Sequence, residues 1–80
     1  MHEMRLLRDM MDDLLRHAER LKVKKIVKVY VRLGEFTEIN PEILTHFFRE
    51  RSRDTVADGA EIVIKPSPRR EIVLESFDCE

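Results

Sequence analysis

The sequence is poor in the residues that small proteins use for cross-links and for sharp chain reversals. Its 80 residues include one cysteine, two glycines and three prolines. A single cysteine excludes an intramolecular disulfide framework and any zinc site built from paired Cys-X-X-Cys motifs. Two glycines in the whole chain also exclude a glycine-rich phosphate-binding loop.

The chain has no excess of charge and no long apolar run. Its 15 basic and 16 acidic residues give a formal net charge of -1, whereas nucleic-acid binding usually requires a basic excess. The lysines between residues 22 and 28 are interpreted as the solvated edge of a strand rather than as a phosphate site. The charged amino-terminal segment does not resemble a signal peptide, and no segment is long enough to cross a membrane. We expect a cytoplasmic protein with no nucleic-acid or membrane partner.

The hydrophobic fraction of 42% is enough for one core, so residues 1–80 are expected to form a single domain. Helical spacing of apolar residues predicts an amphipathic helix over Met4–Leu21. Its buried face should contain Leu7, Met10 or Met11, Leu14, Ala18 and Leu21. The methionines are expected to fill gaps in the core.

The pattern then changes to the two-residue period of a half-buried strand over Lys25–Leu33. Its inward positions are expected to be Val27, Val29, Val31 and Leu33. Asn40 suits a helix N-cap and Pro41 suits the first helical position. The predicted second helix should bury Leu44, Phe47 and Phe48.

Two short strands, Glu61–Lys65 and Arg70–Phe77, follow a turn at Asp58-Gly59. Only Pro66–Arg69 separates them, which predicts a hairpin. The sequence thus predicts an α+β fold in which two helices pack on one face of a three-stranded mixed β-sheet, in the order α-β-α-β-β.

The residues offer little for a nucleophilic enzyme, because no base is associated with the cysteine and no serine–histidine–aspartate motif is present. The unusual feature is Met1-His2-Glu3. The amine of Met1, the ionised amide nitrogen of His2 and its imidazole can form two fused chelate rings, and the amide of Glu3 or a further donor can fill the fourth position. A planar set of nitrogen and oxygen donors suits Ni(II) or Cu(II). The competing interpretation is a frayed, solvated terminus.

Three other residues are candidate metal ligands. His17 lies on the polar side of the first helix and is interpreted as a surface histidine. His46 precedes two phenylalanines and is expected to be partly buried, while Cys79 is expected to be a small apolar strand residue. The alternatives are an imidazole ligand at His46 and an added thiolate ligand at Cys79.

Several segments resemble the HypA family of hydrogenase and urease nickel-incorporation accessory proteins. They are Met1–Met4 before an amphipathic helix, Arg32–Phe36, Asn40–Glu42 with Leu44 and Phe48, and Thr55–Glu61. The resemblance implies a nickel-binding domain with His2 as the side-chain ligand and with Met1 and Glu3 contributing. It also implies two partners, a HypB-type GTPase and a hydrogenase large-subunit precursor.

One departure from that family is large, because the family inserts a zinc module of paired Cys-X-X-Cys motifs after the second strand. One explanation is that the chain stops before the module, with Cys79 as the first zinc ligand of a lost pair. The other is that the module is deleted and that Pro66–Arg69 joins the two segments that would flank it. We favour deletion, because Arg70–Asp78 is similar to the family's returning strand, and because truncation would leave the second strand without its partner. Zinc is therefore not expected.

The sequence thus indicates a nickel metallochaperone-like protein rather than an enzyme, which carries Ni(II) at Met1, His2 and Glu3 for insertion into hydrogenase or urease. Methionine removal normally needs a small second residue, so Met1 should be retained beside His2. The alternative is a protein–protein interaction module without metal, built on the same scaffold. Open edges of a three-stranded sheet would also allow a homodimer.

Overall fold

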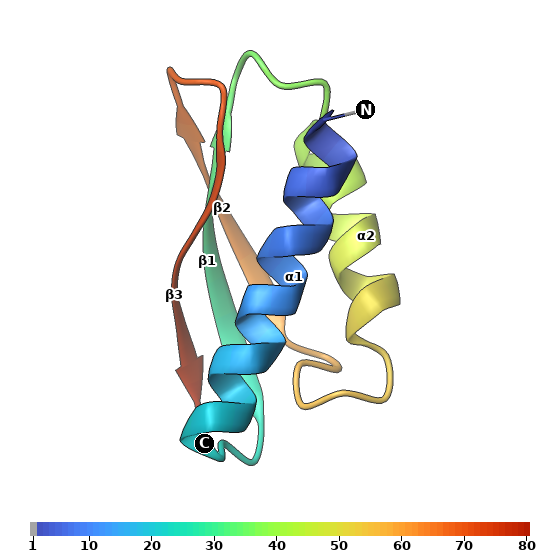
Figure 1. Ribbon diagram of the computed structural model, residues 1–80, viewed down its shortest axis with the longest axis vertical. Helices are drawn as coiled ribbons and strands as arrows, with labels where there is room; N and C mark the ends of the chain where they lie inside the picture. Colours follow the sequence, from blue (N-terminus) through green and yellow to red (C-terminus); the bar gives the residue numbers. More distant parts are fainter. Residues whose placement is uncertain (1) are drawn as a thin grey trace.

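Two helices cover one face of a three-stranded mixed sheet in the computed structural model (Figure 1). It describes residues 2–80 with side chains from residue 4 onward, so Met1 and the side chains of His2 and Glu3 lie outside the described residues. The elements are α1 (His2–Leu21), β1 (Ile26–Gly34), α2 (Pro41–Ser52), β2 (Glu61–Ser67) and β3 (Ile72–Cys79). The predicted fold class and element order are confirmed.

The sheet has the order β2-β1-β3, with β1 in the centre. β2 runs parallel to β1, and β3 runs antiparallel to it. The predicted hairpin between the last two strands is therefore wrong, because both pair with β1 and neither pairs with the other. The argument that truncation would deprive β2 of its partner fails for the same reason.

The core lies between the two helices and the sheet. Its buried apolar side chains are Leu7, Met10, Met11, Leu14, Ala18, Ile26, Val29, Val31, Leu33, Ile39, Leu44, Phe48 and Ala57. Two predicted core positions are wrong. Leu21 is 65% exposed, because α1 ends there and Lys22 turns the chain with a φ of 56°.

Val27 is the second wrong core position, and a β-bulge explains it. Ile26 pairs with Cys79 while Lys28 pairs with Asp78, so β1 carries one extra residue between them. The bulge changes the alternation locally, which buries Ile26 completely and leaves Val27 41% exposed.

The start of α2 agrees with the prediction. The backbone N–H of Ile43 donates to Asn40 Oδ1 over 2.8 Å, and Pro41 occupies the first helical turn. Leu44 and Phe48 are buried, and Phe47 is half-buried.

The connection from β2 to β3 crosses the end of β1 in close contact with Gly34. The Gly34 N–H donates to the carbonyl of Glu71 over 2.7 Å, and the Glu35 N–H donates to the carbonyl of Ser67 over 2.9 Å. A Cβ atom on Gly34 would lie 2.0 Å from the Arg69 carbonyl oxygen. Glycine is therefore required at residue 34 so that the two backbones can meet.

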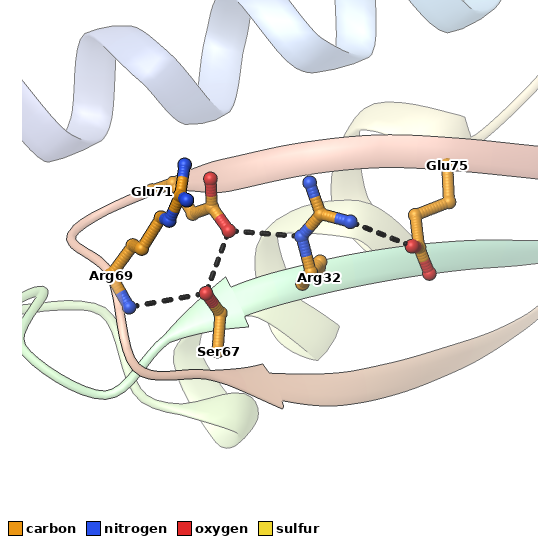
Figure 2. A network of polar contacts seen from close by, with 5 residues as sticks. All are labelled: Arg32, Ser67, Arg69, Glu71 and Glu75. Atoms are coloured by element: carbon orange, nitrogen blue, oxygen red, sulfur yellow. Dashed lines mark hydrogen bonds and ion pairs between the residues drawn. The ribbon is translucent and has the colours of Figure 1, made fainter.

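A polar network braces the same connection from the sheet face that the helices do not cover (Figure 2). The Arg32 guanidinium donates to Glu71 through Nε and to Glu75 through Nη1, each over 2.9 Å. Ser67 Oγ donates to Glu71 over 2.6 Å and accepts from the Arg69 N–H over 3.2 Å. Glu75 is the extra residue at a second bulge, since Tyr30 pairs with Ser76 and Val31 with Leu74. β1 and both ends of the connection are thereby joined.

We predict that Gly34→Ala destabilises the protein by about 2–4 kcal/mol, because the new methyl group would displace backbone atoms of residues 69–71. Gly59→Ala is the matched control. Gly59 has a φ of 80° but open space around its Cβ position, so only a strain of about 1 kcal/mol is expected. Urea unfolding measures both free energies, and equal losses would contradict this account of Gly34.

We also predict that Glu71 makes stability depend on pH in the acidic range. The hydrogen bond from Ser67, and then that from Arg32, lowers the pKa of Glu71, while desolvation opposes the shift. Since the folded-state pKa lies below the unfolded one, the ionised carboxylate stabilises the fold above the unfolded pKa of about 4.3. That stabilisation is lost as the pH falls through the folded-state value.

Glu71→Gln should therefore lose less stability than the unmodified protein between about pH 5 and pH 3, as measured by unfolding curves across that range. Glu19→Gln is the control, because Glu19 is an exposed glutamate on α1 without an ion-pair partner among residues 4–80. Identical pH slopes for Glu71→Gln and the unmodified protein would show that the network does not act in this way.

Candidate functional site

The amino-terminal end of α1 is the position of the predicted metal donors. The helix begins at His2, two residues earlier than its apolar pattern predicts. The first four N–H groups of an α-helix have no partner within the helix, and the amides of His2 and Glu3 belong to this set. Ionising these two nitrogens would therefore break no helical hydrogen bond. Met1 and the side chains of His2 and Glu3 lie outside the described residues.

The two other histidines lie on different helices, and both are exposed. His17 is on the polar side of α1, as predicted. His46 was expected to be partly buried, and that prediction is wrong. It lies two positions from both Leu44 and Phe48, which is about 200° around the helix, so burying these neighbours turns His46 to solvent.

Cys79 lies at the other end of the molecule from the start of α1 (Figure 1). It pairs with Ile26, and the following Glu80 N–H donates to the Lys25 carbonyl over 2.8 Å, next to the carboxyl end of α1. A helix of 20 residues spans about 30 Å. The hypothesis that Cys79 adds a thiolate to the amino-terminal donors is therefore wrong. Cys79 is a strand residue, as predicted, but its side chain is exposed.

The described side chains offer neither a further metal-binding cluster nor an activated phenol. Residues 4–80 contain no cluster of three histidine, cysteine, aspartate or glutamate side chains suited to a metal ion. The Tyr30 hydroxyl donates to Asp78 Oδ2 over 2.9 Å, and this hydrogen bond raises the pKa of Tyr30. The phenol therefore holds its proton more tightly than usual, which is the opposite of an activated nucleophile. Neither α1 nor α2 has the length and apolar composition needed to span a bilayer.

A pocket among the described residues lies where β1 and β2 end and the chain turns into α2. It has a volume of about 340 Å³. Apolar side chains of Leu33, Ile39 and Ile64 line it together with Pro41 and Pro66. Its polar lining comes mainly from the loop between β1 and α2, where Glu35 and Glu38 add carboxylates.

That loop is held by its own hydrogen bonds. Thr37 Oγ1 lies 3.0 Å from the carbonyl oxygens of both Gly34 and Ile39, and Asn40 Oδ1 is occupied by the α2 cap. In contrast, Glu35 and Glu38 are exposed and form no ion pair or side-chain hydrogen bond within residues 4–80. The pocket therefore combines apolar walls with two unpaired negative charges.

Sequence reasoning missed both this pocket and the Arg32–Glu71 network. The predicted strand ended at Leu33, which was expected to be buried, and the predicted second helix began after Asn40. No local pattern indicates that Ile64 and Pro66 from β2 lie opposite the loop between β1 and α2, because this follows from the parallel register that pairs Leu33 with Pro66.

Comparisons with known proteins identify the family to which this chain is similar. The profile of the family described as "Hydrogenase/urease nickel incorporation, metallochaperone, hypA" matches residues 1–79. A curated "Hydrogenase maturation factor HypA" from Caldanaerobacter subterraneus subsp. tengcongensis is 40% identical over 79 residues, which are 99% of this chain and 64% of that protein. The proteins of the same name from Archaeoglobus fulgidus and Pyrococcus horikoshii are 41% and 30% identical, and the matches cover 80% and 99% of this chain.

The chain spans less than two thirds of the length of these relatives, since the three matches cover 64%, 58% and 55% of them. The family match nevertheless extends over nearly all of this chain. The earlier resemblance is thus confirmed, and the chain belongs to the HypA family of hydrogenase and urease nickel-incorporation metallochaperones.

Proposed function

We propose that this chain binds Ni(II) at the amino-terminal end of α1 and delivers it for insertion into hydrogenase or urease during maturation. Membership of the nickel-incorporation family supports the metal and the process. The relatives' name, hydrogenase maturation factor, supports hydrogenase as the enzyme that receives the metal. The observation that carries the position of the site is that α1 begins at His2, which leaves the first amides of the chain without helical partners.

The proposed donors are the amine of Met1, the amide and imidazole nitrogens of His2, and Glu3. A cation at a helix amino terminus is disfavoured by the helix dipole, and ionised amide nitrogens would offset this cost. Because each such nitrogen must lose its proton, metal binding should release protons and weaken as the pH falls. That dependence suits a carrier, which must both hold its metal and release it.

Delivery requires partners, for which we propose a HypB-type GTPase and a hydrogenase large-subunit precursor in the cytoplasm. The chain would act as a carrier and not as an enzyme. β2 and β3 are the edge strands of the sheet. Their outer edges could pair with an edge strand of a second copy to form a homodimer.

We further propose that residues 1–80 form one nickel-binding domain from which the family's zinc module is absent. The support is the short crossing from β2 to β3, which residues 68–71 complete. Gly34 accommodates its backbone, and Arg32, Ser67 and Glu71 tie its two ends together. Such contacts along a short connection are expected if the zinc module is deleted. They are not expected if the chain stops before the module.

A second candidate function is an interaction module that carries no metal. The observation in its favour is Phe36, which is 71% exposed on the loop beside the pocket. Exposed aromatic side chains are enriched in protein interfaces. This alternative predicts partner binding in the absence of stoichiometric nickel.

We predict that only protein with an unextended Met1 and an intact His2 gives the absorption spectrum of square-planar Ni(II). His2→Ala removes the imidazole, and two extra residues before Met1 displace the amine from the chelate rings, so both should abolish that spectrum. Ni(II) titration monitored by absorption and by calorimetry measures binding and proton release.

His46→Ala is the matched control, because His46 is an exposed histidine on another helix. It should bind nickel like the unmodified protein. Equal binding by all four proteins would rule out the amino-terminal site, whereas partner capture without any nickel binding would favour the interaction module.

We also predict that the fold needs no zinc. In protein extended by two residues before Met1, removal of metals with a chelator should leave the urea midpoint unchanged, because the core consists of apolar side chains without a metal cross-link among residues 4–80. Cys79→Ser should behave identically, since Cys79 is exposed. Elemental analysis that finds one zinc per chain, with a lower midpoint on its removal, would contradict the absence of a zinc site.

A further inference from the structure

The pocket beside the loop between β1 and α2 combines an apolar lining with two acidic residues. Leu33, Ile39 and Ile64 supply an apolar lining, and its volume of about 340 Å³ is at the small end of the range for ligand sites. This space suits one long side chain or a short chain segment rather than a large cofactor.

The charged residues that line the pocket favour a positively charged occupant. Glu35 and Glu38 line it, and none of the ten lining residues is basic. The nearby Arg69 extends beside Glu71 in the polar network (Figure 2), which places its charge near that carboxylate. The two carboxylates of the loop form no ion pair within residues 4–80, so both can accept hydrogen bonds from an incoming cation.

Arginine and lysine combine the features that this pocket requires. Their aliphatic stems pack on apolar surface while their charged ends stay near water and carboxylates. Here the stem would contact Leu33, Ile39 and Ile64, and the cation would lie at the exposed carboxylates of Glu35 and Glu38.

Phe36 distinguishes a protein segment from a small free cation. It lies between the two glutamates in sequence and is 71% exposed. A single amine in the pocket would leave this aromatic surface in water, whereas a chain segment could cover it with an apolar neighbouring side chain. Burying an aromatic anchor next to a charge pair is typical of protein interfaces.

We propose that this pocket binds an arginine or lysine side chain presented by a basic segment of a partner protein, with Phe36 packing against that segment. The loop between β1 and α2 and the start of α1 lie at the same end of the molecule (Figure 1). A partner docked here would therefore be held at the end where Ni(II) is proposed to bind. This role in metal transfer rests on the proposed function, but the binding itself does not.

The test uses metal-free protein labelled with ¹⁵N and three probes with blocked ends. They are a single arginine, the tripeptide Leu-Arg-Leu, and the same tripeptide with citrulline, which is neutral, in place of arginine. NMR titration should shift the amides of residues 33–40 and 62–65 with both arginine probes. The citrulline peptide should bind about threefold to tenfold more weakly, and so should the arginine peptide to Glu35→Gln/Glu38→Gln.

Two matched variants complete the experiment. Glu19→Gln alters an exposed glutamate at the far end of α1 and should bind the arginine peptide like the unmodified protein. Phe36→Ser should reduce the affinity of the tripeptide to that of the single arginine.

Equal binding of the arginine and citrulline peptides, or shifts outside the pocket, would overturn the proposal. A tripeptide that binds no better than single arginine would indicate a site for small cations and would overturn the protein occupant. Because no metal is present, failure here is distinct from failure of nickel binding, which the His2→Ala titration tests separately.

Discussion

The central position of β1 is the constraint on which the rest of the structure depends. β2 and β3 pair with this strand and not with each other, so β1 provides all the inter-strand hydrogen bonding of the three-stranded sheet. Its buried residues Ile26, Val29, Val31 and Leu33 also provide the sheet's contribution to the fully buried core. Any change that breaks β1 would therefore separate both edge strands and uncover both helices.

This strand arrangement brings the candidate functional groups to one end of the molecule. The carboxyl ends of β1 and β2 lie at one end of the molecule because the two strands are parallel. The connection to antiparallel β3 starts at the same end, and so does α1 (Figure 1). The proposed metal donors, the acidic pocket and the crossing from β2 to β3 thus share one end, whereas Cys79 is held at the other by its pairing with Ile26.

The crossing from β2 to β3 depends on the close approach of its backbone to Gly34 rather than on a tight turn. Gly34 lets the backbone of residues 69–71 pass over the end of β1, and Arg32 satisfies two carboxylates that would otherwise repel each other. The network leaves the loop between β1 and α2 outside its contacts. As a result, hydrogen bonds hold the sheet end on one side, while Glu35 and Glu38 on the other side form no ion pair within residues 4–80.

The sequence by itself determined the elements, because their signals are local. The spacing of Leu7, Leu14 and Ala18 on α1, and the cap formed by Asn40 and Pro41, follow from helix geometry and were predicted correctly. The tertiary structure alone decided which strands pair, because the short connection between the last two strands favours a hairpin locally, whereas the sheet places β1 between them. It also decided the two bulges, which expose Val27 and bring Glu75 to Arg32, because they depend on pairing between residues more than 40 positions apart in sequence. The acidic pocket belongs to this second group, because it forms only when β2 lies beside β1 in that parallel register.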